Sequence, residues 1–215
     1  MSSFPDPDYK FKICVIGSAG CGKTAMVDQL INGSFSEQTK TTVGVDYRPY
    51  QFTIKDYIVQ LELWDTAGQE TYKSVAKTYF RNACGCVLVF DTTEQASFNE
   101  LTFWLQQFRQ LADPNALILL VGNKVDLENK RQIQPDVAEQ FAKDNMLSYL
   151  ETSALTGQNI RETFERIAHG LFDLVKSGKL QTKGGSKTVL PQENEPTLTE
   201  IADELPNITG GGCGC

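Results

Sequence analysis

The chain has 215 residues, of which 40% are hydrophobic and 22% charged, as expected for a globular protein with one well-buried domain. Its formal net charge is −7 and it has no block of basic residues, which argues against a nucleic-acid partner, because polyanion binding needs a cationic face. The longest apolar run, residues 116–121, is too short to span a bilayer, and we see no secretory signal at the N-terminus.

The first predicted strand, residues 11–16, leads directly into a phosphate-binding motif. Gly17 to Thr24 fits G-x-x-x-x-G-K-[ST], and a helix is expected from about Lys23 to Ile31. Glycines allow backbone N–H groups to surround phosphate oxygens, and the helix N-terminus adds positive dipole. Lys23 would reach the outer phosphates, and the Thr24 hydroxyl would ligate Mg²⁺. The residues expected to contact the nucleotide here are Ser18, Ala19, Gly20, Cys21, Gly22, Lys23, Thr24 and Ala25.

The middle of the chain contains a loop, a hairpin and a second loop. Residues 34–42 are polar and without periodicity, which predicts an exposed, mobile loop. The runs 45–54 and 58–64 flank a short connection and predict the one antiparallel pair of the sheet. Residues 65–70 form a second loop, which leads into a short helix ending near Phe80.

The rest of the chain alternates strands and helices. Ser97 and Glu100 fit a capping box at the start of one helix, and Pro135 suits the first turn of another, which runs to about Asp144. The further strands are expected at 86–90, 117–121 and 147–150, and the last helix at about 160–171. This order predicts an α/β fold, the P-loop NTPase three-layer sandwich: a six-stranded, mostly parallel sheet with one antiparallel strand and helices on both faces.

Two more motifs follow strands, at the sheet edge where such folds bind ligands. Asp65 can hold Mg²⁺, usually through water, while Gly68 can give its N–H to a terminal phosphate and Gln69 can orient an attacking water. Thr42, at the end of the first loop, can supply a second hydroxyl to the metal. The metal ligands expected are therefore Thr24, Thr42 and Asp65.

The motif Asn123-Lys124-Val125-Asp126 points to guanine. Asp126 can accept two hydrogen bonds from the guanine N1–H and exocyclic amine, whereas adenine would leave the carboxylate unpaired, at a cost on the order of 1–3 kcal/mol. Thr152-Ser153-Ala154 can offer a backbone N–H to guanine O6. The base-binding residues expected are Asn123, Lys124, Asp126, Leu127, Ser153, Ala154 and Leu155.

These motifs resemble the small GTPases of the Ras superfamily, and within it the Rab family, over about residues 9–176. The Rab-like stretches are 42–47, 61–70 and 79–83. The resemblance implies an N-terminal extension (1–8), a GTPase domain (9–176) and a flexible tail (177–215). It places Phe35 edge-on against the guanine, with a loop anchor as the alternative, and Lys124 along the base.

The resemblance also implies slow GTP hydrolysis with Mg²⁺, with Lys23 and Gln69 as catalytic residues and strong dependence on an activating protein. The partners implied are an exchange factor, a GTPase-activating protein, a GDP-dissociation inhibitor or escort protein, and effectors. Effectors would read an exposed aromatic trio, Tyr47, Trp64 and Tyr79; filling of the core is the alternative role for these rings.

The C-terminus looks like the Cys-x-Cys ending on which Rab proteins receive two geranylgeranyl groups, here Cys213 and Cys215. From Gly178 onward three lysines face five acids, so no basic patch assists and two lipid chains would have to do the anchoring. The implied location is the cytosol and the cytoplasmic face of intracellular membranes, in vesicle traffic.

The other cysteines are expected to be reduced. Cys14, Cys84 and Cys86 lie in or beside predicted strands and Cys21 lies in the phosphate loop, so they suit small core residues better than disulfides. The single histidine, His169, has no ligand-spaced partner for a metal site.

Two other functions stay open. Ala19 stands where Ras itself has glycine, and its Cβ could crowd Gln69, which favours a nucleotide-locked, membrane-tethered scaffold with little hydrolysis. A metabolic P-loop kinase would call for an arginine-bearing lid, which we do not find, and would leave Asn123-Lys124-Val125-Asp126 unexplained.

Overall fold

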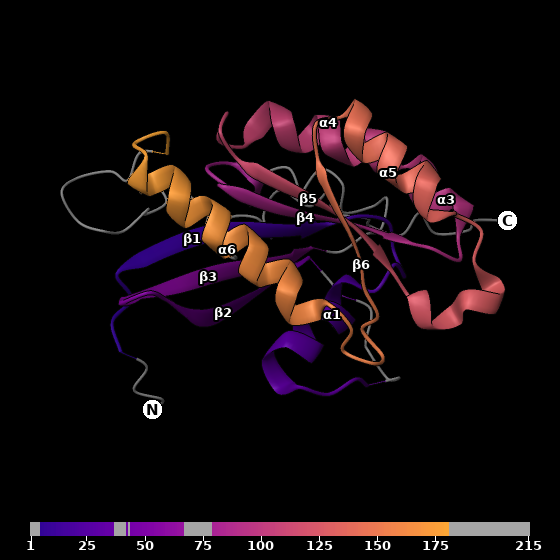
Figure 1. Ribbon diagram of the computed structural model, residues 1–215, viewed down its shortest axis with the longest axis horizontal. Coiled ribbons are helices and arrows are strands. Elements are labelled where there is room, and N and C mark those ends of the chain that lie inside the picture. Colours follow the sequence, from indigo (N-terminus) through magenta and orange to yellow (C-terminus); the bar gives the residue numbers. More distant parts are fainter. Residues whose placement is uncertain (1–4, 37–41, 43, 67–78, 181–215) are drawn as a thin grey trace, which may run out of the picture.

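A computed structural model describes residues 5–36, 42, 44–66 and 79–180 of the chain (Figure 1). Its strands are β1 (Tyr9–Ile16), β2 (Val45–Ile54), β3 (Tyr57–Thr66), β4 (Gly85–Asp91), β5 (Leu117–Asn123) and β6 (Ser148–Glu151). Its helices are α1 (Lys23–Asn32), α3 (Gln95–Asn99), α4 (Leu101–Leu111), α5 (Pro135–Asp144) and α6 (Ile160–Lys176), with a 3₁₀ helix over Val125–Lys130. Among the helices of these residues, none is long and apolar enough to cross a membrane.

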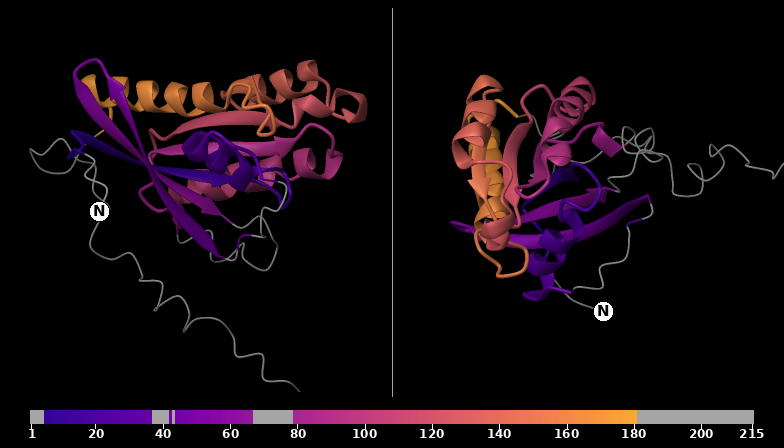
Figure 2. Two further views of the ribbon diagram at one scale, coloured as in Figure 1. Left: turned by 90° about the horizontal axis from the view of Figure 1, so that it is seen from below. Right: turned by 90° about the vertical axis from the view of Figure 1, so that its right-hand side faces the viewer.

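The six strands form one sheet in the order β2-β3-β1-β4-β5-β6. Only the β2–β3 pair is antiparallel, and the other neighbours run parallel. Helices lie on both faces of the sheet, as the two views of Figure 2 show. The predicted fold class is therefore confirmed, including the position of its single antiparallel pair.

The sheet has a hydrophobic core on each face, and strand β1 contributes side chains to both. Its side chains alternate: Phe11, Ile13 and Val15 enter the core under α1 and α6, while Cys14 and Ile16 enter the core under α4 and α5. A strand covered on both faces is a continuous apolar run, which is why residues 11–16 were recognisable as a buried strand. The four cysteines of the described residues are free and buried: Cys14, Cys21, Cys84 and Cys86.

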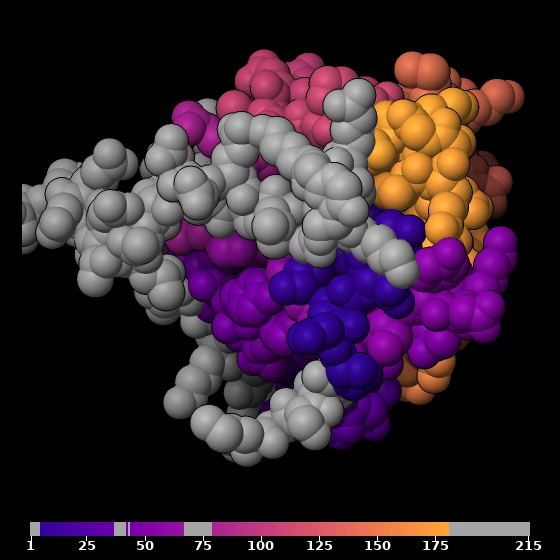
Figure 3. Space-filling view, turned by 90° about the vertical axis from the view of Figure 1, so that its left-hand side faces the viewer, coloured from indigo at the N-terminus to yellow at the C-terminus, as the bar shows by residue number. Residues whose placement is uncertain are grey.

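At one end of the sheet, α6 is fixed to the β1 and β3 ends by aromatic contacts. Phe172 packs on Tyr9 and Tyr57 with ring centroids 5.5 Å apart in each pair, and the Lys176 ammonium lies 4.0 Å from the Tyr57 ring centroid. Figure 3 shows this side of the molecule, with the orange α6 beside the purple hairpin. The functional motifs lie at the opposite ends of β1, β3, β4, β5 and β6, because parallel strands bring their carboxyl ends to one edge.

One sequence expectation about the helices is wrong. The capping box at Ser97–Glu100 does not form: α3 begins at Gln95 with Glu94 as its N-cap, and Glu100 is the single residue between α3 and α4. The Ser97 hydroxyl instead bonds the backbone of Asp91 and of Glu94. The short helix expected before Phe80 falls almost wholly outside the described residues.

Candidate functional site

The loop between β1 and α1 needs glycine at two positions, because a Cβ at either would clash with a neighbouring strand residue. Gly17 has φ +143°, and a Cβ there would lie 2.1 Å from the Val89 carbonyl oxygen. Gly22 has φ +97°, and a Cβ there would lie 2.2 Å from Nδ2 of Asn123. Since L side chains rarely adopt these conformations, the loop can pack against β4 and β5 only with glycine at both places.

Lys23 is the buried cation of this loop. Its Nζ donates to the Gly17 carbonyl at 2.9 Å and to the Ser18 carbonyl at 2.8 Å, and only 5% of the residue is exposed. Ala19 and Gly20 are exposed at the loop tip. A buried ammonium held by the loop's own carbonyls can turn to a phosphate that enters the loop, because a phosphate offers it a stronger, charge-assisted bond.

The three predicted metal ligands come together from three separate segments. The Thr24 hydroxyl donates to Asp65 Oδ2 at 2.5 Å and lies 2.8 Å from the Thr42 hydroxyl. The other carboxylate oxygen, Asp65 Oδ1, is buried without a hydrogen-bond partner within the described part of the chain. Two hydroxyls and a carboxylate with an unsatisfied oxygen are the hard oxygen donors that Mg²⁺ prefers.

The electrostatics of Asp65 agree with this donor set. Burial raises the pKa of the Asp65 carboxyl to about 6, against the lowering effects of the Thr24 hydrogen bond and the Lys23 charge. A divalent cation at this carboxylate would supply the charge that burial leaves uncompensated. The residues present therefore fit Mg²⁺.

Asn123, at the end of β5, ties the phosphate loop to the base-binding loops. Its Nδ2 donates to the Cys21 carbonyl at 3.0 Å, while its Oδ1 accepts from the Thr152 hydroxyl at 3.2 Å and from the Ala154 N–H at 3.1 Å. The residue is 1% exposed. Every hydrogen-bonding atom of this amide is thus used within the protein, so Asn123 assembles the site.

The remaining base-motif side chains are also anchored. The Ser153 hydroxyl donates to Asp126 Oδ1 at 2.5 Å. The Ser153 side chain therefore orients Asp126, the residue predicted to bind guanine. Lys124 has φ +69°, and its Nζ lies 2.6 Å from Asp91 Oδ2 at the end of β4. Asp126 is exposed and Lys124 is half-buried.

Three apolar residues predicted to contact the nucleotide lie outside the hydrophobic core. Phe35 is 37% exposed and Leu155 50% exposed, so neither belongs to the core. Leu127 is half-buried at the kink of the 3₁₀ helix, with φ −93° and ψ 45°. The exposure of Phe35 disfavours its alternative role as a buried loop anchor.

The aromatic trio is a contiguous row, but its exposure is not uniform. Trp64 lies between Tyr47 and Tyr79, with ring centroids 5.4 Å and 5.2 Å away. Tyr47 is 44% exposed, Trp64 is half-buried and Tyr79 is 6% exposed. The expectation that all three rings are exposed is therefore wrong for Tyr79, which is the buried end of the row.

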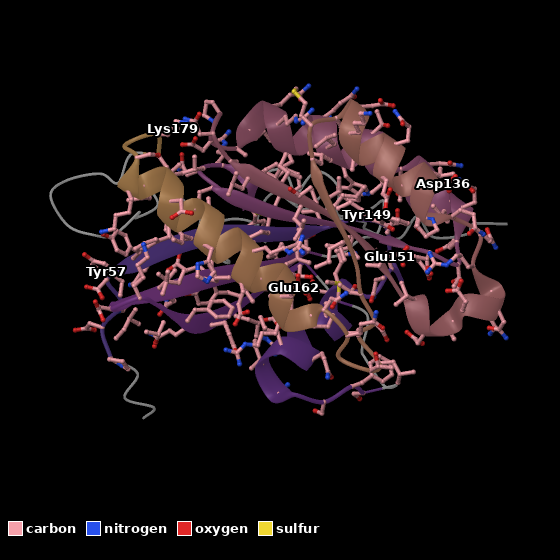
Figure 4. All side chains as sticks on the ribbon, in the orientation of Figure 1. Tyr57, Asp136, Tyr149, Glu151, Glu162 and Lys179 are labelled. Atoms are coloured by element: carbon pink, nitrogen blue, oxygen red, sulfur yellow. The ribbon has the colours of Figure 1, made fainter. Side chains whose placement is uncertain are left out.

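A partly buried ion pair that no sequence pattern indicates supports the loops predicted to bind the base. Arg131 donates to both carboxylate oxygens of Glu151, at 2.8 and 3.0 Å, and the Tyr149 hydroxyl donates to Glu151 at 2.9 Å. Figure 4 labels Tyr149 and Glu151 at the end of β6. Desolvation and the Glu151 charge raise the pKa of Tyr149, so the phenol keeps its proton. The Arg131–Glu151 pair connects the segment after the 3₁₀ helix to the residue before Thr152.

The predictions for Gly68, Gln69, Cys213 and Cys215 lie outside the described residues.

The sheet order, the glycine-dependent loop and the motifs at the strand ends define a P-loop GTPase fold. The family model described as "Ras family" matches residues 12–173. Human Ras-related protein Rab-4B is 42% identical over 214 residues, covering 97% of this chain and 98% of the relative. Human Rab-4A is 42% identical over 210 residues (96% and 95%), and Rab-11C of Dictyostelium discoideum is 36% identical over 204 residues (95% and 91%).

The chain belongs to the Rab family of small GTPases, within the Ras family, and is therefore an enzyme that hydrolyses GTP.

Proposed function

We propose that this GTPase is a membrane-attached switch of vesicle traffic, which holds GTP or GDP with Mg²⁺ and recruits effectors in the GTP state. The observation that carries the proposal is the meeting of Thr24, Thr42 and Asp65 in one hydrogen-bonded group beside the phosphate loop. Thr42 belongs to the segment between α1 and β2, so a ligand held by these three groups would fix that segment to the core.

The proposed roles follow from the contacts. Lys23 and the loop N–H groups bind the phosphates, and Asp126, oriented by Ser153, selects guanine. Bound at Thr24, Thr42 and Asp65, Mg²⁺ would neutralise phosphate charge. Gln69 would orient the attacking water and Gly68 would bind the terminal phosphate. Loss of that phosphate would then free Gly68 and Thr42 together, which is an order–disorder switch.

Membrane attachment and partner binding complete the proposal. Two geranylgeranyl groups on Cys213 and Cys215 would hold the protein on the cytoplasmic face of intracellular membranes, and a dissociation inhibitor or escort protein would carry it through the cytosol. An exchange factor and an activating protein would set the nucleotide state. Effectors would contact the row Tyr47–Trp64–Tyr79 through its exposed end, Tyr47.

The proposal is tested by single-turnover hydrolysis of bound GTP in Mg²⁺, comparing the protein with its Gln69→Leu variant. We expect slow decay in the parent, on the order of 10⁻⁴ s⁻¹, and at least tenfold slower decay in the variant. Equal rates would remove Gln69 from the mechanism.

A second candidate, a nucleotide-locked scaffold, is favoured by the exposed Ala19 at the loop tip. It predicts that the parent neither hydrolyses GTP nor exchanges its nucleotide. An Ala19→Gly variant would then regain hydrolysis, because it removes the Cβ that would crowd Gln69.

A further inference from the structure

Glu100 occupies an unusual position between two helices. It is the C-cap of α3 and the N-cap of α4, and its side chain makes no capping hydrogen bond at the start of α4. Its neighbours are firmly held: Leu101 is fully buried, Trp104 is 1% exposed, and Ser97 is bonded to the backbone of Asp91 at the end of β4. The corner formed by Glu100 is therefore a fixed point beside the site.

The carboxylate of Glu100 reaches the phosphate loop. The Ser18 hydroxyl donates to Glu100 Oε2 at 2.7 Å, across 82 residues of sequence. The carbonyl of the same Ser18 accepts from the Lys23 ammonium at 2.8 Å. One loop residue is thus held by its side chain to the helix corner and by its backbone to the phosphate-binding lysine.

The negative charge of Glu100 by itself would weaken anion binding at the loop, so the value of the Ser18–Glu100 bond must lie elsewhere. A carboxylate beside an anion-binding loop repels the ligand that the loop would bind. A hydrogen bond to a charged acceptor, however, is stronger than a neutral one and fixes geometry. A loop already held in its binding conformation loses less entropy when the ligand enters, so the bond can slow ligand release despite the charge.

We propose that Glu100 is a positioning residue for the nucleotide, which holds the phosphate loop through the Ser18 hydroxyl and so lengthens the time that GDP or GTP stays bound. The proposal rests on the proposed nucleotide binding. It assigns the effect to the hydrogen bond between two side chains, so a neutral acceptor of the same shape should serve in place of the carboxylate.

The test is release of a fluorescent GDP analogue from the full chain in Mg²⁺, chased with excess GDP. Ser18→Ala and Glu100→Ala should each release it about fivefold faster, the factor that one ordinary hydrogen bond is worth. The double variant should be no more than about twofold faster than either single one, because both remove the same bond. Glu100→Gln should stay within about twofold of the parent, because its amide oxygen still accepts from Ser18.

Glu139→Ala is the matched control, since it removes one exposed acid from α5, away from the loop, and should leave release unchanged. Additive effects of the two alanine substitutions, or a Glu100→Gln variant as fast as Glu100→Ala, would overturn the proposal. So would lowered thermal unfolding midpoints with parental release rates, which would mark a purely structural contact. A parent that holds no guanine nucleotide would instead contradict the proposed function.

Discussion

The two halves of the site are built in different ways. In the base half, Asn123, Asp126 and Ser153 already bond one another's loops, and Arg131 with Glu151 supports them from below. In the phosphate–metal half, Lys23 bonds carbonyls of its own loop, and the Thr24 hydroxyl bonds both the Thr42 hydroxyl and the Asp65 carboxylate. The base half is preassembled. In the phosphate–metal half the loop backbone is held through Ser18 and Cys21, but the Lys23 ammonium and the metal-site oxygens make contacts that a ligand would replace.

This difference suits a switch. A rigid base half would keep hold of the guanine in both proposed nucleotide states, which is needed if the protein is to remain loaded. A half whose internal bonds must be exchanged can respond to whether a terminal phosphate is present.

Asp126→Asn should give the largest loss. It removes the carboxylate that would accept two hydrogen bonds from guanine, and two charge-assisted bonds are worth about 100-fold or more in GDP affinity. Titration calorimetry with GDP measures the loss. Asp136→Asn, an exposed acid on α5, is the control that removes the same charge elsewhere. A loss below threefold at Asp126 would remove it from the base site.

Asp65→Asn should act through the metal. We expect release of GDP in Mg²⁺ to become about tenfold faster and to lose most of its response to chelation, because the amide is a poorer ligand than a carboxylate. Asp56→Asn, in the hairpin turn at the other end of β3, should respond to EDTA as the parent does. If Asp65→Asn keeps the full chelator response, Mg²⁺ is held by other residues.

The third prediction concerns stability and distinguishes the Arg131–Glu151 pair from an ordinary surface pair. Arg131→Met should lower the free energy of unfolding by about 2 kcal/mol, since it leaves the Glu151 carboxylate without its bidentate partner. Arg166→Met breaks only an exposed pair with Glu162 on α6 and should cost about 0.5 kcal/mol or less. Urea unfolding at one fixed, saturating GDP and Mg²⁺ concentration gives both values, and equal costs would contradict a support role for Arg131.

The sequence predicted most of the strands and the motif positions because these depend on local patterns. Apolar runs gave the strands, and each motif follows a strand, so the topology brings the motifs together. The contacts that fix the motifs were not predictable, since they join distant residues: Asp91 with Lys124, Arg131 with Glu151, and Ser18 with Glu100. The capping box was wrong for the same reason. Ser97 and Glu100 have the spacing of a capping box, but Ser97 bonds the backbone of Asp91 and Glu100 bonds the Ser18 hydroxyl.

The most direct test of the two-halves account is amide hydrogen exchange of the GDP-loaded protein, with Mg²⁺ and after chelation with EDTA. The account predicts that chelation increases exchange in peptides covering residues 17–24 and 65–66, and leaves those covering 122–126 and 151–154 unchanged. An equal or larger increase in the base-half peptides would show that the base half is not preassembled, and would contradict the account.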